Sequence, residues 1–587
     1  MRQDGKWDLT AIYAGFEDPA YEKDIACIGE WLGLAEKLLA AGDADLHALV
    51  ELYEKLGEKL RTVSALSMLT LSAEAGNRQA MAQQDRIMKI SMRMRQAASA
   101  MTAYVGGMED LEERIGADPF LKARAFFLRD MKEKYAHILP PEIENVVLKM
   151  SMSGAQAWSQ LRGRLDAGHM IDIELDGEMK HLPLSAVRGL AYNADAAVRK
   201  KAYEAELASY PRMETAMAAC LNGIKGESIT RAELRHYASP LDAALESANM
   251  DRETLDALLT AMKESLPGFR RYFRLKARAL GHEGGLPFWE LFAPLGGSGK
   301  VYTAQEAKEL LMDVLGGFSS EMGEFIGYMF DHDHIDMYPR EGKRGGAFCA
   351  GVHSAKTSYI LTNFDGSLDS VGTLAHELGH GFHNVCMQDI PALAAGYPMP
   401  LAETASIFNE TLFSDALKKR SQGSDMLAIL DQELSGAAQV IVDIMSRFLF
   451  EKEVFARRED HTMSAEELCA IMTDAQKQTY GDGLDEEQMH PYMWACKPHY
   501  YSAGLDFYNF PYAFGLLFGK GVFALCEKMG KDAFLPVYKE LLRSAGSGNV
   551  REVAAGVGID VADPEFWRQS LRVVLAGVDE MEKLVNG

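Results

Sequence analysis

Residues Thr373–Val385 read T-L-A-H-E-L-G-H-G-F-H-N-V and contain the pattern H-E-x-x-H, formed by His376, Glu377 and His380. On a helix, residues four positions apart lie one above the other on the same face, so both imidazoles point at one place. That is the geometry a divalent metal ion needs, and Glu377 lies beside the ion, where its carboxylate can accept a proton from bound water. The stretch therefore predicts a zinc-binding helix that carries a general base.

The residues around the motif favour a buried helix. D-G-S-L-D at 365–369 offers a turn and an N-cap, and apolar residues recur on one face between Val371 and Phe382. Gly379 and Gly381 are poor helix formers, costing about 1 kcal/mol each relative to alanine. Two such residues beside the second histidine predict that another group approaches the helix backbone closely.

Zinc in a catalytic site takes three protein ligands and keeps one position open. The longer pattern H-E-x-x-H-x-x-G-x-x-H fails here, because His383 and Cys386 occupy the positions of its glycine and its third histidine. Glu403 is the better candidate, since it follows two prolines that prepare a helix start, and a second helix crossing the first could deliver it to the metal. Glu410, two turns further on, either hydrogen-bonds a ligating imidazole or is a solvated surface carboxylate.

H-E-L-G-H, followed by A-E-T-A-S-I-F-N-E at 402–410 and preceded by G-K-R-G-G-A-F-C at 342–349, resembles the M3 family of zinc metallopeptidases, and within it the oligoendopeptidase F group. The resemblance runs from Trp7 to about residue 575 and is most specific around these motifs. It implies one zinc ion per chain. The implied ligands are His376, His380 and Glu403, with Glu377 as the catalytic base.

A histidine and several tyrosines lie further along, in residues 497–512. Amide hydrolysis builds an oxyanion, which neutral O–H and N–H donors stabilise. The resemblance implies that His499 and Tyr508 stabilise the transition state and that Tyr512 binds substrate. Tyr508 and Tyr512 are four residues apart, which predicts that they share a helix face. For the neighbouring Tyr500, Tyr501 and Phe510, aromatic core packing is the alternative.

Residues 332–363 combine glycine clusters with β-branched and aromatic residues, which predicts short strands at 345–348 and 358–361. An edge strand beside the metal-binding helix would pair with an extended peptide backbone, so we predict that Gly346, Ala347 and Phe348 bind substrate. The alternative is a small structural hairpin. Lys343 and Arg344 either hold a peptide carboxylate or pair with local acidic residues.

Most of the remaining chain has helical periodicity, and a β-hairpin with an Asp-Gly turn is expected at 170–182. Helices are expected at 18–41, 44–75, 77–106, 118–134, 141–164, 194–232, 252–280, 304–331, 424–458, 463–479 and, with a loop near 545–549, over 514–586. We place a boundary near residue 185, between an N-terminal helical domain (1–185) and a catalytic domain (186–587). The resemblance implies a mainly α, zincin-like fold: two helical bodies around a deep substrate cleft, with a small β-sheet beside the zinc-binding helix.

Composition narrows the class of function. The 587 residues carry a net charge of −24, which argues against binding to nucleic acid or to anionic membranes. No run of eighteen apolar residues and no secretory signal occurs, and the seven cysteines are scattered without C-x-x-C pairs. We therefore expect a cytoplasmic protein with reduced thiols.

The combined prediction is a zinc-dependent oligoendopeptidase that hydrolyses internal bonds of short peptides. Two alternatives remain open at this point. One is a related helical zinc carboxypeptidase, which would trim peptides from one end. The other is a non-catalytic peptide-binding protein.

Overall fold

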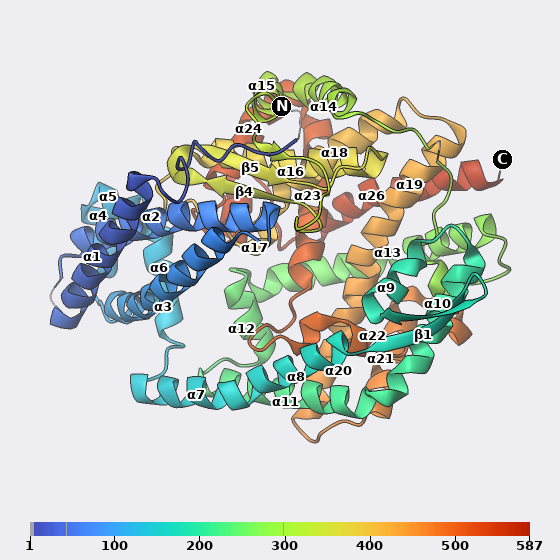
Figure 1. Cartoon of the computed structure of the whole chain (residues 1–587), viewed down its shortest axis with the longest axis horizontal. Helices are drawn as coiled ribbons and strands as arrows, with labels where there is room; N and C mark the ends of the chain where they lie inside the picture. Colours follow the sequence, from blue (N-terminus) through green and yellow to red (C-terminus); the bar gives the residue numbers. More distant parts are fainter. Residues whose placement is uncertain (1–4, 43, 298, 587) are drawn as a thin grey trace. The chain divides into compact units, whose positions relative to one another are not determined.

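The computed structural model describes residues 5–42, 44–297 and 299–586. The chain is mainly helical, with two small sheets (Figure 1). By packing it divides into two units that are discontinuous in sequence, of which the first comprises Met1–Ile138, Gly299–Leu417 and Leu525–Ile559. Such units do not test the predicted domain boundary near residue 185, which stays a prediction. Among the described residues, no helix is long and apolar enough to cross a membrane.

The first unit carries the H-E-x-x-H motif. Its elements are α1 (Pro19–Ala41), α2 (Leu46–Ala73), α3 (Arg78–Gly106), α4 (Leu111–Ala117), α5 (Pro119–Lys122), α6 (Ala125–Tyr135), α14 (Ala304–Phe318), α15 (Ser320–Asp331), β3 (Ile335–Asp336), β4 (Phe348–Val352), β5 (Thr357–Leu361), α16 (Leu368–Met387), α17 (Met399–Ala402), nearly all of α18 (Thr404–Lys418), α24 (Lys531–Ser544) and α25 (Val550–Gly556).

The second unit comprises Leu139–Ser298, Lys418–Ala524 and Asp560–Gly587. Its elements are α7 (Pro141–Ser153), α8 (Ala155–Ala167), β1 (Met170–Leu175), β2 (Glu178–Pro183), α9 (Leu184–Gly189), α10 (Ala196–Ser209), α11 (Glu214–Leu234), α12 (Pro240–Ser247), α13 (Arg252–Ala279), α19 (Gly423–Ala438), α20 (Ile444–Arg458), α21 (Ala465–Tyr480), α22 (Met493–Cys496), α26 (Pro564–Asn586) and the greater part of α23 (Phe510–Met529).

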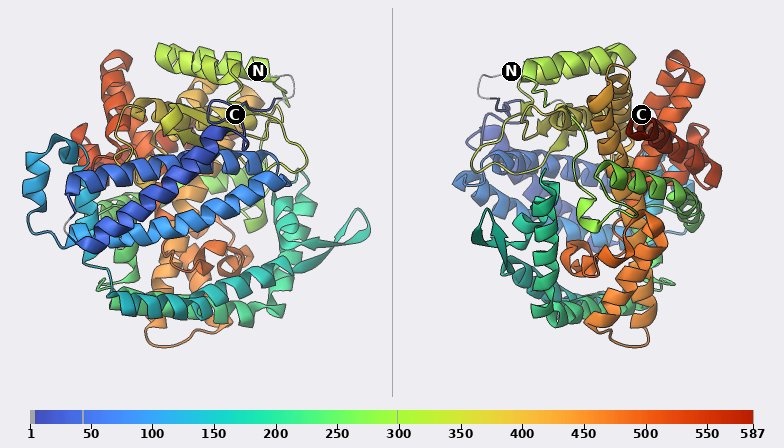
Figure 2. Two further views of the ribbon diagram at one scale, coloured as in Figure 1. Left: turned by 60° about the vertical axis from the view of Figure 1, so that its left-hand side comes forward. Right: turned by 90° about the vertical axis from the view of Figure 1, so that its right-hand side faces the viewer.

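The predicted hairpin and the first three predicted helices are confirmed. Three long helices, α1, α2 and α3, pack on one another, as the left view of Figure 2 shows. Each begins at a side-chain cap, supplied by Asp18, Asp45 and Asn77. The β1–β2 hairpin turns at Asp176-Gly177, where both residues have positive φ as a tight hairpin turn requires.

Several long predicted helices are interrupted. The expected helix at 141–164 breaks at Gly154, and the one at 304–331 breaks at Ser319, which caps α15. The helices expected over 194–232 are α10 and α11, which are separated at Tyr210–Arg212, where Pro211 lies. Glycine, proline and capping serine interrupt a helix locally without disturbing the apolar periodicity on either side, and periodicity alone misses them.

The sheet of the first unit lies against the motif helix. Its strand order is β3-β5-β4, so β4 is an edge strand, and both β4 and β5 contact α16 (Figure 1). The other face of the sheet packs against α2 and against Trp7, whose ring lies edge-on to Tyr359 at 6.1 Å. The W-D-L-T stretch that begins at Trp7 thus helps to hold the sheet in place.

The strand predicted at 345–348 is displaced, because β4 begins where that prediction ends, at Phe348. Gly346 has a φ of +79°, and the Asn363 side chain donates to the carbonyls of Arg344 and Gly346, which stabilises a bend before the strand. The second predicted strand is confirmed as β5. The Lys343 side chain is buried and pairs with Asp336 at 2.6 Å, which agrees with the second alternative, pairing with local acidic residues.

The helix α16 begins at the predicted cap and packs closely on its neighbours. The Ser367 hydroxyl accepts a hydrogen bond from the backbone of Ser370 at 3.1 Å. A Cβ atom on Gly379 would lie 2.5 Å from the Ala405 carbonyl oxygen, and one on Gly381 would lie 2.5 Å from the Phe325 ring. The predicted close approach to this helix is therefore confirmed at both glycines.

The two glycines give different predictions. Gly379→Ala would force α16 away from the α18 backbone, and we expect a loss of about 1–3 kcal/mol of stability together with weaker zinc binding. Gly381→Ala meets only a side chain that can rotate, and it gains about 1 kcal/mol of helix propensity, so it should be nearly neutral. Urea unfolding and zinc titration of both variants measure the difference. Equal effects at the two positions would contradict the role assigned to Gly379.

Candidate metal centre

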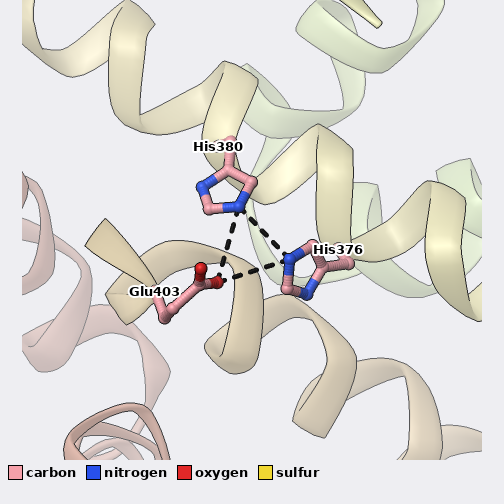
Figure 3. A group of neighbouring side chains, drawn as sticks. All are labelled: His376, His380 and Glu403. Carbon is pink, nitrogen blue, oxygen red and sulfur yellow. Dashed lines mark hydrogen bonds and ion pairs between the residues drawn. The ribbon is translucent and has the colours of Figure 1, made fainter. Parts of the chain in front are cut away.

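Two imidazoles and one carboxylate converge in the first unit. His376 and His380 project from α16, and Glu403 lies at the junction of α17 and α18, as Figure 3 shows. The Nε2 atoms of the histidines lie 3.2 Å apart. Oε2 of Glu403 lies 3.3 Å from Nε2 of His376 and 3.5 Å from Nε2 of His380. The structure thus brings together the three side chains predicted as ligands.

These distances fit a zinc ion. Zinc ligands lie at about 2.0–2.2 Å, so two tetrahedral ligands are about 3.3 Å from each other. The triangle of 3.2, 3.3 and 3.5 Å therefore matches three of the four corners of a zinc site. Two histidines and one glutamate also form a known catalytic donor set, which leaves the fourth position for water or substrate.

Each ligand is oriented by a further contact. Nδ1 of His376 donates to Oε1 of Glu410 at 3.0 Å, so the carboxylate helps to keep Nε2 available as a ligand. The His380 ring hydrogen-bonds the backbone of Ala402. The buried Ser406 hydroxyl donates to Oε2 of Glu403 at 2.7 Å. The contact between Glu410 and His376 agrees with the first of its two alternatives, a hydrogen bond to a ligating imidazole.

The sequence analysis did not identify Ser406 as a residue of the site. The signal present was its position three residues after Glu403, where a serine at the start of a helix can reach back to the preceding carboxylate. Its hydroxyl also donates to the backbone carbonyl of Glu403 at 3.0 Å. That carbonyl accepts the first bond of α18, from the backbone N–H of Ile407. Glu403 is therefore fixed by both its backbone and its side chain.

The charges in the centre shift the pKa values of its residues in opposite directions. Burial alone would lower the pKa of His376, but its bond to Glu410 and the charges of Glu410 and Glu403 raise it to about 9. Burial lowers the pKa of His380. Without metal the carboxylates thus favour a proton on His376, and a divalent cation in the site replaces that proton.

Glu377 is buried beside the centre with one oxygen unused. Burial raises its pKa to about 7, the charges of Glu403 and Glu410 add to this effect, and His376 opposes it. A backbone hydrogen bond from Cys349 also holds the carboxylate. Oε2 of Glu377 has no hydrogen-bond partner in the part of the chain that the structure describes. A buried carboxylate oxygen with a free lone pair is suited to accept a proton.

His383 and Cys386, which lie further along the motif helix, face the core. Nε2 of His383 donates to the Leu542 carbonyl at 3.1 Å and the ring stacks on Tyr397, while burial lowers the pKa of His383 to about 3. Burial raises the pKa of the Cys386 thiol to about 12. Both residues are therefore core residues, consistent with the failure of the longer histidine pattern in the sequence.

His499, Tyr508 and Tyr512 lie together in the second unit. The rings of His499 and Tyr508 are 5.6 Å apart, and the hydroxyls of the two tyrosines are 2.9 Å apart. Burial and the positive charges of Arg447 and Lys497 lower the pKa of His499 to about 4, so the ring is neutral near pH 7. Tyr508 precedes α23 and is not on one helix with Tyr512, but the two side chains meet as expected.

Tyr500, Tyr501 and Phe510 are buried in the core, as the alternative of aromatic core packing predicted.

The loop that carries Tyr508 is anchored by a buried ion pair. Lys225 is fully buried and donates to Asp506 at 2.9 Å and to Glu451 at 2.6 Å. Phe507, between Asp506 and Tyr508, has a φ of +50°, which is strained for a bulky residue. Its ring packs on Phe448 at 5.3 Å, and this packing helps to hold the strained backbone in place.

Of the three residues near the sheet that we predicted to bind peptide, only Phe348 lies in a strand. Gly346 is exposed in the preceding bend, and Ala347 connects the two. Cys349, the next residue of β4, is the one whose backbone contacts Glu377. The sheet edge and the metal centre thus meet at the start of β4.

Comparison with known proteins identifies the family. The model of peptidase family M3 matches residues 189–293 and 323–573, and a model described as oligopeptidase F matches residues 107–168. Oligopeptidase PepF of Bacillus subtilis is 23% identical over 597 residues, covering 100% of this chain and 88% of that one. The chromosomal oligoendopeptidase F of Lactococcus lactis subsp. cremoris is 27% identical over 394 residues, covering 66% of this chain and 64% of that one.

Solved structures show the same fold. A protein of Chlamydophila abortus assigned as a peptidase is 24% identical and has a TM-score of 0.87, covering 100% of this chain and 99% of that one. Oligoendopeptidase-F from Enterococcus faecium is 19% identical with a TM-score of 0.69, covering 97% and 99%. The family model spans more than half of the sequence, and its match includes every residue of the candidate metal centre. The chain therefore belongs to peptidase family M3 and is a metallopeptidase of the oligopeptidase F group.

Proposed function

We propose that this chain is a zinc-dependent oligoendopeptidase that hydrolyses internal bonds of short peptides and binds one zinc ion. The observation that carries the proposal is the close triangle of Nε2 of His376, Nε2 of His380 and Oε2 of Glu403, with the buried carboxylate of Glu377 beside it. The family supports peptide hydrolysis, and the donor set supports zinc.

His376, His380 and Glu403 would hold zinc, which would act as a Lewis acid toward the scissile carbonyl and the attacking water. Glu377 takes a proton from the attacking water on its free oxygen and later returns it to the leaving amine. Burial raises the pKa of Glu377 to about 7 in the metal-free site, and a cation bound nearby would lower it, which favours the ionised form that accepts the proton. Neutral His499 and the Tyr508 hydroxyl donate hydrogen bonds to the oxyanion, and Tyr512 orients the Tyr508 hydroxyl.

The outer edge of β4 supplies backbone groups for an extended peptide. The Ile360 N–H donates to the His334 carbonyl on the β3 side of β5, so Tyr359 and Leu361 direct their backbone groups toward β4. Ala350, opposite Tyr359, is therefore hydrogen-bonded within the sheet. Cys349 and Gly351 direct their backbone N–H and C=O groups to the free edge. A peptide that pairs with this edge, and that passes Gly346, Ala347 and Phe348, lies beside Glu377.

A digest of a mixed peptide library, with and without a chelator, tests the proposal as a whole. We expect metal-dependent internal cuts, identified by mass spectrometry. Stepwise removal of single residues from one end would instead indicate the carboxypeptidase alternative. Binding without any cut would indicate a peptide-binding protein.

The first prediction concerns the proposed base. Glu377→Gln keeps the size and the burial but removes proton acceptance, so kcat should fall by about 10²–10⁴-fold while zinc content is retained. Zinc analysis together with a fluorogenic peptide assay measures both quantities. Peptide cleavage at the wild-type rate would refute the assignment.

The second prediction concerns the third ligand. Glu403→Ala should lower zinc affinity by more than the about 10–100-fold typical for the loss of a supporting contact, because a direct ligand is removed. Glu410→Gln is the matched comparison and should fall within that range. Both are measured by titration against a competing chelator. Full zinc occupancy in Glu403→Ala would move the third ligand elsewhere, with Glu410 first in line.

The third prediction concerns the oxyanion donor. Tyr508→Phe should lower kcat by about 10²–10³-fold with little change in KM, because the hydroxyl acts only on the charge that develops. Tyr500→Phe is a suitable control, since the Tyr500 hydroxyl is buried without a hydrogen-bond partner among the described residues. Equal activity of the two variants would exclude Tyr508 from catalysis.

A further inference from the structure

The first unit contains a cavity of about 520 Å³ that the proposed mechanism does not use. It lies between the turn that joins β4 to β5, the C-terminal half of α16, α15 and the loop at 392–396. Phe325, Val385 and Met387 give it apolar walls, while Asn384 and Gln388 add polar groups. A space of this size exceeds the volume of one large side chain, and the mixed lining is typical of ligand sites.

The free edge of β4 leads into this cavity. Gly351 lines it and lies two residues from Cys349, whose backbone contacts Glu377, so the two positions are about 6.6 Å apart along the strand. Directly opposed residues of a ladder place their side chains on the same face of the sheet. The face that belongs to Gly351 is the one toward Asn384, because a Cβ atom on Gly351 would lie 2.8 Å from that side chain. A peptide residue paired with Gly351 therefore directs its side chain to the α16 side, where the cavity lies.

One charged group of the cavity has little to bind within the protein. Arg61 of α2 is exposed, and its guanidinium donates one long bond, of 3.4 Å, to the Ala392 carbonyl. Among the described residues it forms no ion pair, and desolvation lowers its pKa although the charges of Glu58 and Glu54 oppose this. The carboxylates near it on α2 have other partners, since Glu58 bonds His353 at 3.1 Å and Glu54 pairs with Arg124.

Two of the other charges of the cavity are already paired. Lys356 pairs with Asp389 at 2.6 Å, and Glu321 pairs with Lys539 at 2.5 Å. Glu324 is exposed on α15 as Arg61 is on α2, and it is the competing charge that lysine-containing peptides test. A guanidinium that offers a planar fork of five donors and uses one of them weakly is best satisfied by a carboxylate.

We propose that this cavity is a substrate subsite in which Arg61 binds a carboxylate of the peptide, carried by or near the residue that pairs with Gly351. The inference rests on the proposed function, because only a peptide paired with β4 is guided there. The carboxylate belongs either to the peptide's C-terminus or to an aspartate or glutamate side chain. Both offer the same two oxygens to the guanidinium.

Binding to the metal-free protein tests the inference without turnover, and it prevents the carboxylate from binding zinc instead. The probes are fluorescein-labelled octapeptides in four forms: a free C-terminal acid, its C-terminal amide, amides in which one glutamate replaces one glutamine at each position in turn, and amides in which one lysine does so. We expect one carboxylate form to bind with at least about tenfold higher affinity than its neutral counterpart. The form that shows the gain identifies the source of the carboxylate.

Arg61→Gln should abolish that preference and leave the affinity for the neutral peptide unchanged. Arg95→Gln is the matched control, since it removes the same charge from an exposed position on α3, and it should keep the preference. Arg61→Lys keeps the charge but loses the planar fork, so it should keep only part of the preference. Thermal unfolding confirms that each variant is folded.

A preference that persists in Arg61→Gln, or wild-type binding that does not distinguish carboxylate from neutral peptides, would overturn the inference. Tighter binding of lysine-containing peptides would overturn it in favour of Glu324. The proposed function fails separately, if the zinc-loaded protein binds these peptides with the expected preference and cuts none of them. Cleavage without any carboxylate preference leaves the proposed function intact and removes the subsite.

Discussion

The structure of the metal centre depends on the close contact between α16 and the start of α18. Glu403 can reach the two imidazoles because Gly379 has no side chain, which lets the Ala405 carbonyl come within the space of a Cβ atom. The Asn409 side chain adds a hydrogen bond across the same contact, to the Ala375 carbonyl at 3.3 Å. Three ligand atoms can be held within a few tenths of an ångström of zinc geometry only if their two helices are fixed to the same accuracy.

The sequence predicted those parts of the site that depend on local spacing. His376 and His380 converge because they are one helical turn apart, and Gly379 marks the close approach, so both features follow from a single helix. Glu403 required a helix that crosses the first, and the family resemblance made that choice. The support that Ser406 gives to Glu403, and the burial of Lys343 against Asp336, depend on contacts that no periodicity records.

The same limit explains what the sequence missed elsewhere. The cavity beside β4 is formed by α2, α15, α16 and the β4–β5 turn, which lie up to some three hundred residues apart in the chain. The buried pair of Lys225 and Asp506 joins residues 281 positions apart. A buried charge that loses its partner costs about 3–5 kcal/mol, so this pair fixes the loop before Tyr508 more firmly than its exposed residues suggest. Neither feature leaves a local pattern.

The composition of β4 has a physical reason that joins the fold to the chemistry. The strand reads F-C-A-G-V, and the residues on its α16 face are the small Cys349 and Gly351. Larger residues there would push the strand from the helix, and the backbone of Cys349 would then no longer reach Glu377. The same two residues direct their backbone groups to the free edge of the strand. The packing that holds Glu377 beside the sheet is therefore a consequence of two small residues, Cys349 and Gly351.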